Sequence, residues 1–487
     1  MRSGAAAFAR PVEATVPREV VPAWLLQLCF IAAHVPLALA IPKHSRLAAI
    51  HALLALGIGL IAAVMPRKSH FVAYAAAYIT GAAVFWRMKA AKIPWEFDKY
   101  AIVAIFVVAL VFSVRIRRPA FALAYVALLV PSAFLTLSSA SWADAKAMLS
   151  FNLSGPIALG CSMLFFSSIR LSPAQMRWLA TSLLAPIVGI AAIAAYSLQA
   201  ALQDPDFEFY GGSSNATTSG GFGPNQVSAI LGLGIVAILV YLIVAKASRV
   251  LSGAMLFLTL LLLRQCLITL SRGGIYMALG AVAAASFYLL RERAYRRKLL
   301  AGGAVVAVIL IVVVIPRLQA MTGGVLVSRF ENTSGTGREL LIKGDLDSWS
   351  QNPLLGVGPG MGGANRLKYF SVPTAHTEYT RLLAEHGLLG LVSLVLLGAM
   401  AVRNIRDQKT PQARAVSAAF LTYALLFMAV DAMRFGAPAF VFGVSGVTLV
   451  VARRRMRAVA PARRRASVEA AQVPRVNQAR PAGRKFP

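Results

Sequence analysis

Apolar runs of about twenty residues recur along almost the whole chain, with short polar connections between them. A bilayer core about 30 Å thick requires roughly 20 apolar residues per helix, so each run is a candidate membrane span. With 58% hydrophobic and only 14% charged residues, this 487-residue chain cannot be a set of soluble domains. The runs cover 23–41, 46–65, 70–86, 100–114, 119–137, 152–168, 178–200, 225–245, 250–270, 273–290, 299–315, 387–402, 414–432 and 436–452. We therefore predict an all-α membrane protein, a polytopic helical bundle of about 12 to 14 transmembrane helices with one large loop that contains helices.

Basic residues indicate the orientation, because cytoplasmic connections of membrane proteins are enriched in Lys and Arg. The chain has 49 Lys plus Arg against 18 Asp plus Glu, a formal charge of +31. A cytoplasmic N-terminus puts most of these bases inside, although one outside loop, with Arg87, Lys89, Lys92 and Lys99, disagrees. The scheme comprises a cytoplasmic tail (1–22), eleven spans (23–315), a large outside loop (316–386), three spans (387–452) and a basic cytoplasmic tail (453–487). We expect the last tail to be disordered and to bind lipid headgroups, and we predict no nucleic-acid partner.

Two polar segments lie outside in this scheme. The first, 202–224, has three acids and no base, and the second, 316–386, is too polar to enter lipid. Each contains an acidic pair, Asp204 with Asp206 and Asp345 with Asp347, which fits either a divalent cation or solvated turns. We favour turns. No His/Cys cluster has ligand spacing, so neither a metal site nor a cofactor is predicted.

Arginines within or beside apolar runs are candidate functional residues, since Arg at the bilayer centre costs about 2.5–3.5 kcal/mol on insertion scales. Arg264 interrupts one run and Arg272 follows in LITLSRGG. A continuous helix would place both on one face, with Gly273 and Gly274 breaking it after Arg272. A structural role, by snorkelling or pairing, stays open for Arg264.

The large loop carries a second group of candidates. It contains Arg329 and Arg338, a glycine-rich stretch at 352–365 that either forms turns or cradles an anion, and His376 where the next helix begins. A helix N-terminus and neighbouring arginines both disfavour the imidazolium form, so His376 should be neutral and able to accept a proton. His386 is interpreted as an ordinary interfacial histidine. Three residues of the same segment could orient a substrate or the histidine, or simply pack: Glu378, Tyr379 and Arg381.

Five segments together resemble the O-antigen ligase and O-antigen polymerase family. They are GFGPNQVSAILGL at 221–233 (with Asn225), SRGG at 271–274, GREL at 337–340, NPLLGVGPGM at 352–361 and HTEYTRLLAEHGLLGL at 376–391. Their order and membrane placement carry the resemblance, because no single motif is decisive. The likeness covers about 221–398, a little over a third of the chain.

The resemblance implies a metal-independent glycosyltransferase of the inner membrane, with about twelve spans and a large periplasmic loop. It implies a glycan on undecaprenyl pyrophosphate as donor, and either lipid A-core or a second lipid-linked glycan as acceptor; we favour the ligase with lipid A-core. By family pattern His376 is the catalytic base and Arg272 and Arg338 bind the diphosphate, with Arg329 as a competing match for Arg338. We add Arg264 to the diphosphate-binding candidates and Asn225 to the substrate-orienting ones. A lipid-linked-sugar transporter is the alternative class, but the chain lacks the internal repeat typical of such folds.

Overall fold

The computed structural model describes residues 21–210, 214–245, 248–332 and 337–450. The predicted tails, 1–22 and 453–487, fall almost wholly outside these residues. Within them the chain is helical apart from one pair of two-residue strands. The helices are α1 (Ala23–Ala40), α2 (Arg46–Val64), α3 (Ser69–Met88), α4 (Phe97–Phe112), α5 (Ala120–Ala127), α6 (Val130–Ser139), α7 (Trp142–Ser168), α8 (Pro173–Ala201), η1 (Thr217–Ser219), α9 (Pro224–Val244), α10 (Arg249–Ile268), α11 (Gly273–Leu289), α12 (Arg293–Ile309), η2 (Leu310–Val314), α13 (Ile315–Met321), α14 (Val325–Glu331), α15 (Arg338–Gln351), α16 (Gly363–Leu367), α17 (Glu378–Arg406), α18 (Pro411–Asp431) and α19 (Ala437–Ser445).

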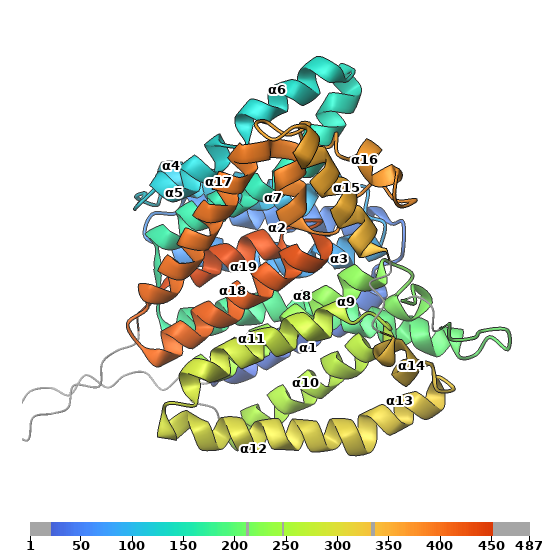
Figure 1. The fold of residues 1–487 in the computed structure, drawn as a ribbon. Coiled ribbons are helices and arrows are strands. Elements are labelled where there is room, and N and C mark those ends of the chain that lie inside the picture. The colour runs from blue at the N-terminus through green and yellow to red at the C-terminus, as the bar shows by residue number, and fades with distance from the viewer. Residues whose placement is uncertain (1–20, 211–213, 246–247, 333–336, 451–487) are drawn as a thin grey trace, which may run out of the picture. The chain divides into compact units, whose positions relative to one another are not determined.

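The predicted all-α polytopic fold is confirmed. In the described part of the chain, 11 helical segments are long and apolar enough to cross a membrane, and α11 is a shorter apolar helix. Helices α8, α9, α11 and α18 lie side by side in the centre of the bundle (Figure 1) and supply much of its core. The large loop contains helices, as predicted: α14, α15 and α16 all lie within 316–386.

The last predicted span, 436–452, differs from the expected helix. Helix α19 has only nine residues, a rise of about 14 Å. The chain then becomes extended, and β2 (Thr448–Leu449) pairs in parallel with β1 (Arg170–Leu171) at the start of α8. Non-helical backbone at membrane depth must find internal partners. Here Gln408 Nε2 donates to Val447 O at 2.9 Å, so the extended part is held by protein contacts.

The expectation that one helix carries Arg264 and Arg272 is wrong. Helix α10 ends at Ile268, Leu270 adopts φ +54°, and α11 begins at Gly273, so the break precedes the glycines. Gly274 serves packing instead, because a Cβ there would lie 1.9 Å from Ser228 O of α9. Gly274 therefore lets α9 and α11 approach closely, and Arg264 and Arg272 do not share a helix.

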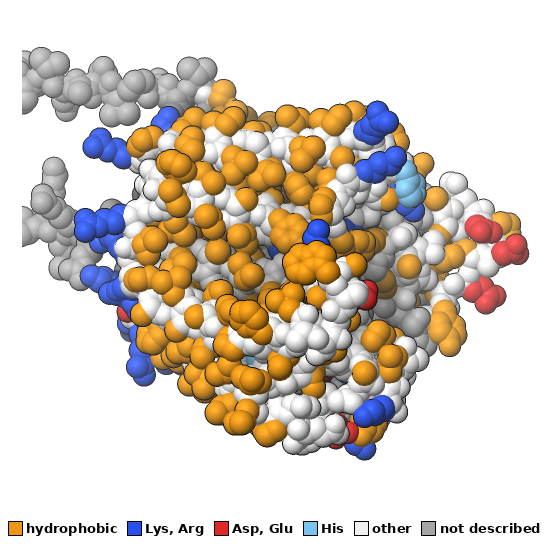
Figure 2. Space-filling model, turned by 90° about the horizontal axis from the view of Figure 1, so that it is seen from above, with side chains coloured by type: hydrophobic (Ala, Val, Ile, Leu, Met, Phe, Trp, Pro, Cys, Tyr) orange, Lys and Arg blue, Asp and Glu red, His pale blue; other side chains and the backbone are white. Residues whose placement is uncertain are grey.

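The ends of the helices define two faces of the bundle. One, the site face, carries the connections at 89–96, 202–210, 214–223, 269–272, 322–332, 337–377 and 432–436. Arg87, in the last turn of α3, joins the turn at 432–436 to α9 by donating to Arg434 O and Gln226 Oε1. The opposite face carries the turns at 113–119, 169–172, 290–292 and 407–410, where Arg118 pairs with Asp407. Exposed bases such as Arg117, Arg293 and Arg297 belong to the opposite face. Figure 2 shows a broad field of hydrophobic side chains, with Lys and Arg mostly along its borders.

The loop that disagreed with the charge scheme has a structural explanation. Arg87 and Lys99 are buried, with side chains 6% and 1% exposed, and they pair with Asp98 and Glu96 respectively. Buried, paired bases are held by packing, so they carry little information about orientation. Lys92 in the same loop is exposed and stays at odds with the scheme.

Candidate active site

His376 lies on the site face, directly before α17. Thr377 caps this helix by accepting a hydrogen bond from Tyr379 N at 3.3 Å, so the imidazole stands next to the helix N-terminus, as expected. The carbonyl of His376 accepts from Ala432 N at 3.2 Å, which joins the histidine to the end of α18. The ring is half-buried, and its Nδ1 has no hydrogen-bond partner among the described residues.

Arg434 is the nearest cation to this histidine, and the sequence prediction missed it. Its Nη2 donates to His376 Nε2 at 3.3 Å, and its Nε lies 3.6 Å from Asp431 Oδ1. Arg434 lies between two apolar runs, and a charged residue at such a position is typical of the end of a membrane span. The available signal was a charged pair, with Asp431 at the end of the run at 414–432 and Arg434 three residues later.

Three of the predicted arginines come together beside this pair. Arg338 is the first residue of α15, Arg272 caps α11, and Arg329 projects from α14 and donates from Nε to Leu270 O at 3.2 Å. Burial lowers the pKa of Arg338, the charge of Asp431 raises it, and the charges of Arg272 and Arg434 lower it further. Burial, Arg272 and Arg338 likewise lower the pKa of Arg329. These four arginines, which we call the arginine cluster, therefore repel one another and favour an anion among them.

The electrostatic surroundings keep His376 neutral. Burial is the main cause that lowers its pKa to about 4, followed by the charges of Arg434 and Arg338. At pH 7 the imidazole is therefore unprotonated. Because Nε2 accepts a hydrogen bond from a guanidinium, the ring proton lies on Nδ1, and Nε2 is the basic nitrogen.

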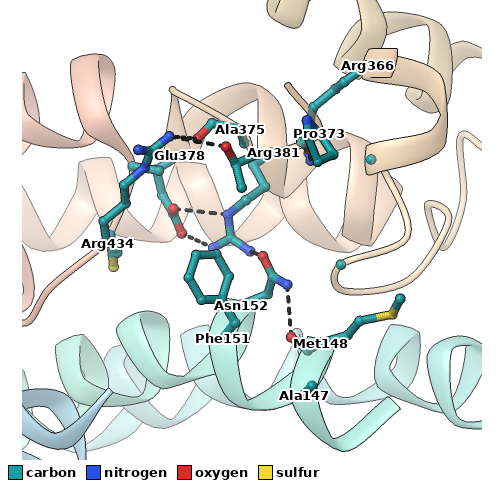
Figure 3. Close-up of a pocket in the computed structure, with 15 residues that line it drawn as sticks. Ala147, Met148, Phe151, Asn152, Arg366, Pro373, Ala375, Glu378, Arg381 and Arg434 are labelled. Carbon is teal, nitrogen blue, oxygen red and sulfur yellow. Dashed lines mark hydrogen bonds and ion pairs between the residues drawn. The ribbon is translucent and has the colours of Figure 1, made fainter. Parts of the chain in front are cut away.

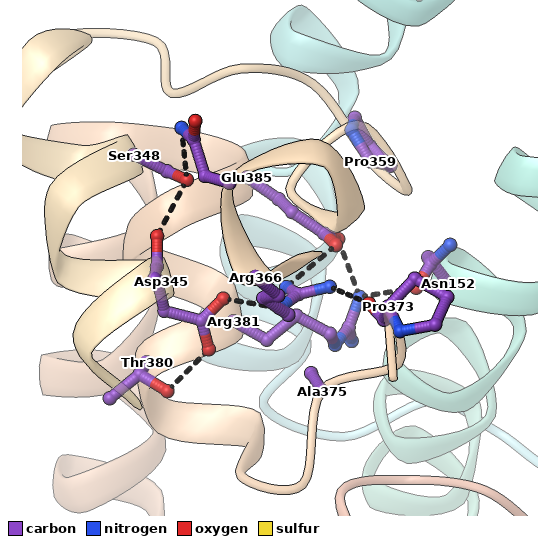
Figure 4. A network of polar contacts seen from close by, with 12 residues as sticks. Asn152, Asp345, Ser348, Pro359, Arg366, Pro373, Ala375, Thr380, Arg381 and Glu385 are labelled. Carbon is purple, nitrogen blue, oxygen red and sulfur yellow. Dashed lines mark hydrogen bonds and ion pairs between the residues drawn. The ribbon is translucent and has the colours of Figure 1, made fainter. Parts of the chain in front are cut away.

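A buried ionic network supports the start of α17 (Figure 4). Arg381 pairs with Glu378 and, at 2.8 Å, with Glu385, while Arg366 pairs with Asp345 at 2.6 Å and with Glu385 at 3.5 Å. All five side chains are 5% exposed or less. The network ties α15 and α16 of the large loop to α17, so it fixes where His376 stands.

The network and Arg434 surround a cavity of about 300 Å³ (Figure 3). Glu378 and Arg381 of α17 face it from one side, and Phe151 and Asn152 of α7 face it from the other. Arg434 lines it beside Ala375, the residue before His376. The predicted substrate-orienting residues Glu378 and Arg381 thus reach a cavity, although their charges already pair with each other.

The other predicted residues lie in different settings. Arg264 is exposed on α10, and none of its contacts joins the arginine cluster. Asn225 Oδ1 accepts a hydrogen bond from Ser271 Oγ at 2.8 Å, so it contacts the residue that precedes Arg272. Tyr379 donates its hydroxyl to Leu425 O at 2.9 Å, a packing contact with α18. His386 is not interfacial as predicted: it is fully buried and bonded to Ser132, because α17 bends at Gly387.

The glycine-rich stretch forms turns. Gly356, Gly358 and Gly360 adopt positive φ, and the amides of Val357 and Gly358 donate to Ala384 O at 2.9 Å and Glu385 O at 3.1 Å. These amides bind α17, so they do not cradle an anion. Of the acidic pairs, Asp204 and Asp206 form an exposed turn, whereas Asp345 and Asp347 lie on α15. The described residues contain no group of three His, Cys, Asp or Glu placed to hold a metal ion.

The fold and the site define a class: a polytopic helical membrane protein whose largest loop brings arginines to a neutral histidine at one face. A family model described as O-antigen ligase matches residues 257–395, from α10 into α17. The match covers less than a third of the chain, and over that segment the protein is similar to the O-antigen ligase family. The matched segment contains His376 and three members of the arginine cluster, but not Arg434. Comparison with curated proteins gave no significant match.

Proposed function

We propose that this protein transfers a glycan en bloc from undecaprenyl pyrophosphate to a lipid A-core acceptor, with inversion at the anomeric carbon. The observation that supports this most is a neutral histidine beside four arginines at one face of a membrane-spanning bundle. The exposed bases of the opposite face support a cytoplasmic assignment for that face, and therefore a periplasmic site in the inner membrane.

The reaction needs a base on one side and cations on the other. The acceptor hydroxyl gives its proton to Nε2 of His376 as its oxygen attacks the anomeric carbon. The bond from that carbon to the diphosphate oxygen breaks, and undecaprenyl pyrophosphate leaves as an anion that requires no proton. Arginines stabilise the charge that develops on the diphosphate, because charge-assisted hydrogen bonds from guanidinium to phosphate are strong and directional.

Reconstitution tests the activity and the acceptor together. Purified protein is given a lipid-linked glycan with lipid A-core in one reaction and with a second lipid-linked glycan in another. Transfer to lipid A-core supports the ligase, and chain extension in the second reaction alone would show the polymerase. Absence of transfer in both reactions, with folded protein and verified donor, contradicts the proposal. NMR of the product linkage tests inversion.

Arg338→Gln should weaken donor binding. The change removes one half-buried cation from the arginine cluster, and a hydrogen bond to a charged group contributes about 1.5–3 kcal/mol. We expect about a tenfold to hundredfold higher dissociation constant for farnesyl diphosphate, a short polyprenyl diphosphate. Arg264→Gln, on the exposed side of α10, is the matched arginine control. Equal affinities for the two variants would remove Arg338 from the diphosphate site.

The pH dependence of transfer should report His376. A group whose pKa is lowered to about 4 stays in its basic form until the pH falls through that value. The acid limb of kcat/KM, which reflects the free enzyme, should therefore lie near pH 4 and not near 6.5. Bound diphosphate adds negative charge near His376 and raises the pKa of its imidazole. The acid limb of kcat should therefore lie at higher pH than the acid limb of kcat/KM. An acid limb of kcat/KM at the ordinary histidine value would contradict the assignment.

A further inference from the structure

Charged side chains of α3 and α4 hold the backbone of the segment between α18 and α19. Each contact is made to a main-chain atom: Lys99 Nζ donates to Met433 O at 3.1 Å, Arg87 Nη1 and Nη2 donate to Arg434 O at 3.2 Å, and Asp98 Oδ2 accepts from Gly436 N at 2.5 Å. Three charged side chains bonded to one short turn indicate that its position matters. These contacts fix the backbone position from which the Arg434 side chain extends.

The guanidinium of Arg434, by contrast, is loosely held. It lies 3.3 Å from His376 Nε2, 3.4 Å from Thr374 Oγ1 and from Ala375 O, and 3.6 Å from Asp431 Oδ1. Charge-assisted hydrogen bonds normally measure about 2.7–2.9 Å. Arg381 of the buried network lies 2.8 Å from Glu385, and Arg366 lies closer still to Asp345, at 2.6 Å. Arg434 is therefore the arginine beside the histidine that can change partners at low cost.

In this structure the Arg434 guanidinium donates a hydrogen bond to Nε2, the basic nitrogen of His376, and thereby covers it. His376 Nε2 cannot accept the proton of an acceptor hydroxyl while it accepts a hydrogen bond from Arg434. Arg434 also lies close enough to Arg338 to lower its pKa, and it lines the 300 Å³ cavity. The same guanidinium thus contacts the base and acts on another member of the arginine cluster.

We propose that Arg434 is a positioning residue that covers Nε2 of His376 in the donor-free protein and turns to the donor diphosphate when the donor binds, which uncovers the base. This inference rests on the proposed function and adds an order of events to it: the donor must arrive before the acceptor hydroxyl can be deprotonated. A base that is covered without donor would also suppress deprotonation of water or acceptor in the empty site.

Variants at Arg434 test the two contacts separately. Arg434→Gln removes the charge and Arg434→Lys keeps it, while Arg406→Gln, exposed at the opposite end of α17, is the control. The probes are farnesyl diphosphate for binding and the acid limb of kcat/KM for the base. The charged groups that act on His376 from the neighbouring elements are Arg434, Arg338 and Arg366, so loss of one charge should move the limb to higher pH.

We expect Arg434→Gln to bind farnesyl diphosphate about tenfold more weakly and to show an acid limb at higher pH. Arg434→Lys should keep the wild-type acid limb and recover part of the affinity, which a purely structural role would not produce. Unchanged affinity in Arg434→Gln overturns the transfer of Arg434 to the diphosphate. An unchanged acid limb overturns its contact with the base. If His376→Gln abolishes transfer while Arg434→Gln behaves as wild type, only this inference fails and the proposed function stands.

Discussion

Replacement of His376 by glutamine should reduce glycan transfer by about 10²–10⁴-fold, the usual contribution of a positioned general base. Glutamine keeps a hydrogen-bonding side chain of similar length, but it cannot take up the acceptor proton. The arginine cluster is untouched, so donor affinity should stay near wild type. The measurement is the initial rate of transfer with purified protein, together with farnesyl diphosphate binding.

Two controls accompany this variant. Arg406→Gln, on the opposite face, should transfer glycan at the wild-type rate, and a single symmetric peak in size-exclusion chromatography should show that His376→Gln folds. Wild-type transfer by His376→Gln would exclude the imidazole as the base. Loss of donor binding along with transfer would point to a structural role for the residue.

Arg381→Ala should destabilise the protein more than any other single change considered, by about 3–5 kcal/mol. The substitution leaves Glu378 and Glu385, both 0% exposed, without the cation that pairs with both of them, and among the described residues Glu385 keeps only its 3.5 Å ion pair with Arg366. The apparent Tm in detergent should fall accordingly. Arg403→Ala is the matched control on the same helix, because its pair with Asp407 is 3.7 Å long and partly exposed, and such pairs contribute at most about 1 kcal/mol.

A rescue experiment separates charge from volume in this network. Arg381→Met combined with Glu378→Gln and Glu385→Gln replaces the ionic group by neutral side chains of similar size, and it should recover much of the lost Tm. Equal Tm losses for Arg381→Ala and Arg403→Ala would show that the network contributes little to stability.

Hydrophobic runs and helix starts were predictable because they depend on neighbours in sequence. The runs at 225–245 and 414–432, for example, correspond closely to α9 and α18. His376 could be placed before α17 because Pro373 and the apolar run that follows mark a helix start. The last run, 436–452, shows the limit: it is apolar throughout, yet α19 stops at Ser445 because extended backbone finds partners on β1 and Gln408.

Side-chain pairing could not be predicted in the same way. Arg264 and Arg381 both look costly in an apolar setting, but Arg264 turns outward, whereas Arg381 finds two carboxylates within its own helix. In the sequence, Arg434 has the position of a charged residue that ends a span. It contacts His376 only because the end of α18 packs against the residues that precede α17. Arg87 and Lys99 looked like topology signals until the 433–436 turn supplied their partners.

The sequence by itself determined that this protein is a polytopic helical bundle with a large polar loop, because transfer of apolar surface out of water depends on local composition. It also determined the motifs that carry the family resemblance. Only the tertiary structure decided which charges meet: the arginine cluster, the Arg434–His376 contact and the buried network each join segments distant in the chain. Ion pairs and hydrogen bonds require their atoms to lie within about 3–4 Å of each other, so they are set by how the helices pack and not by the order of the residues.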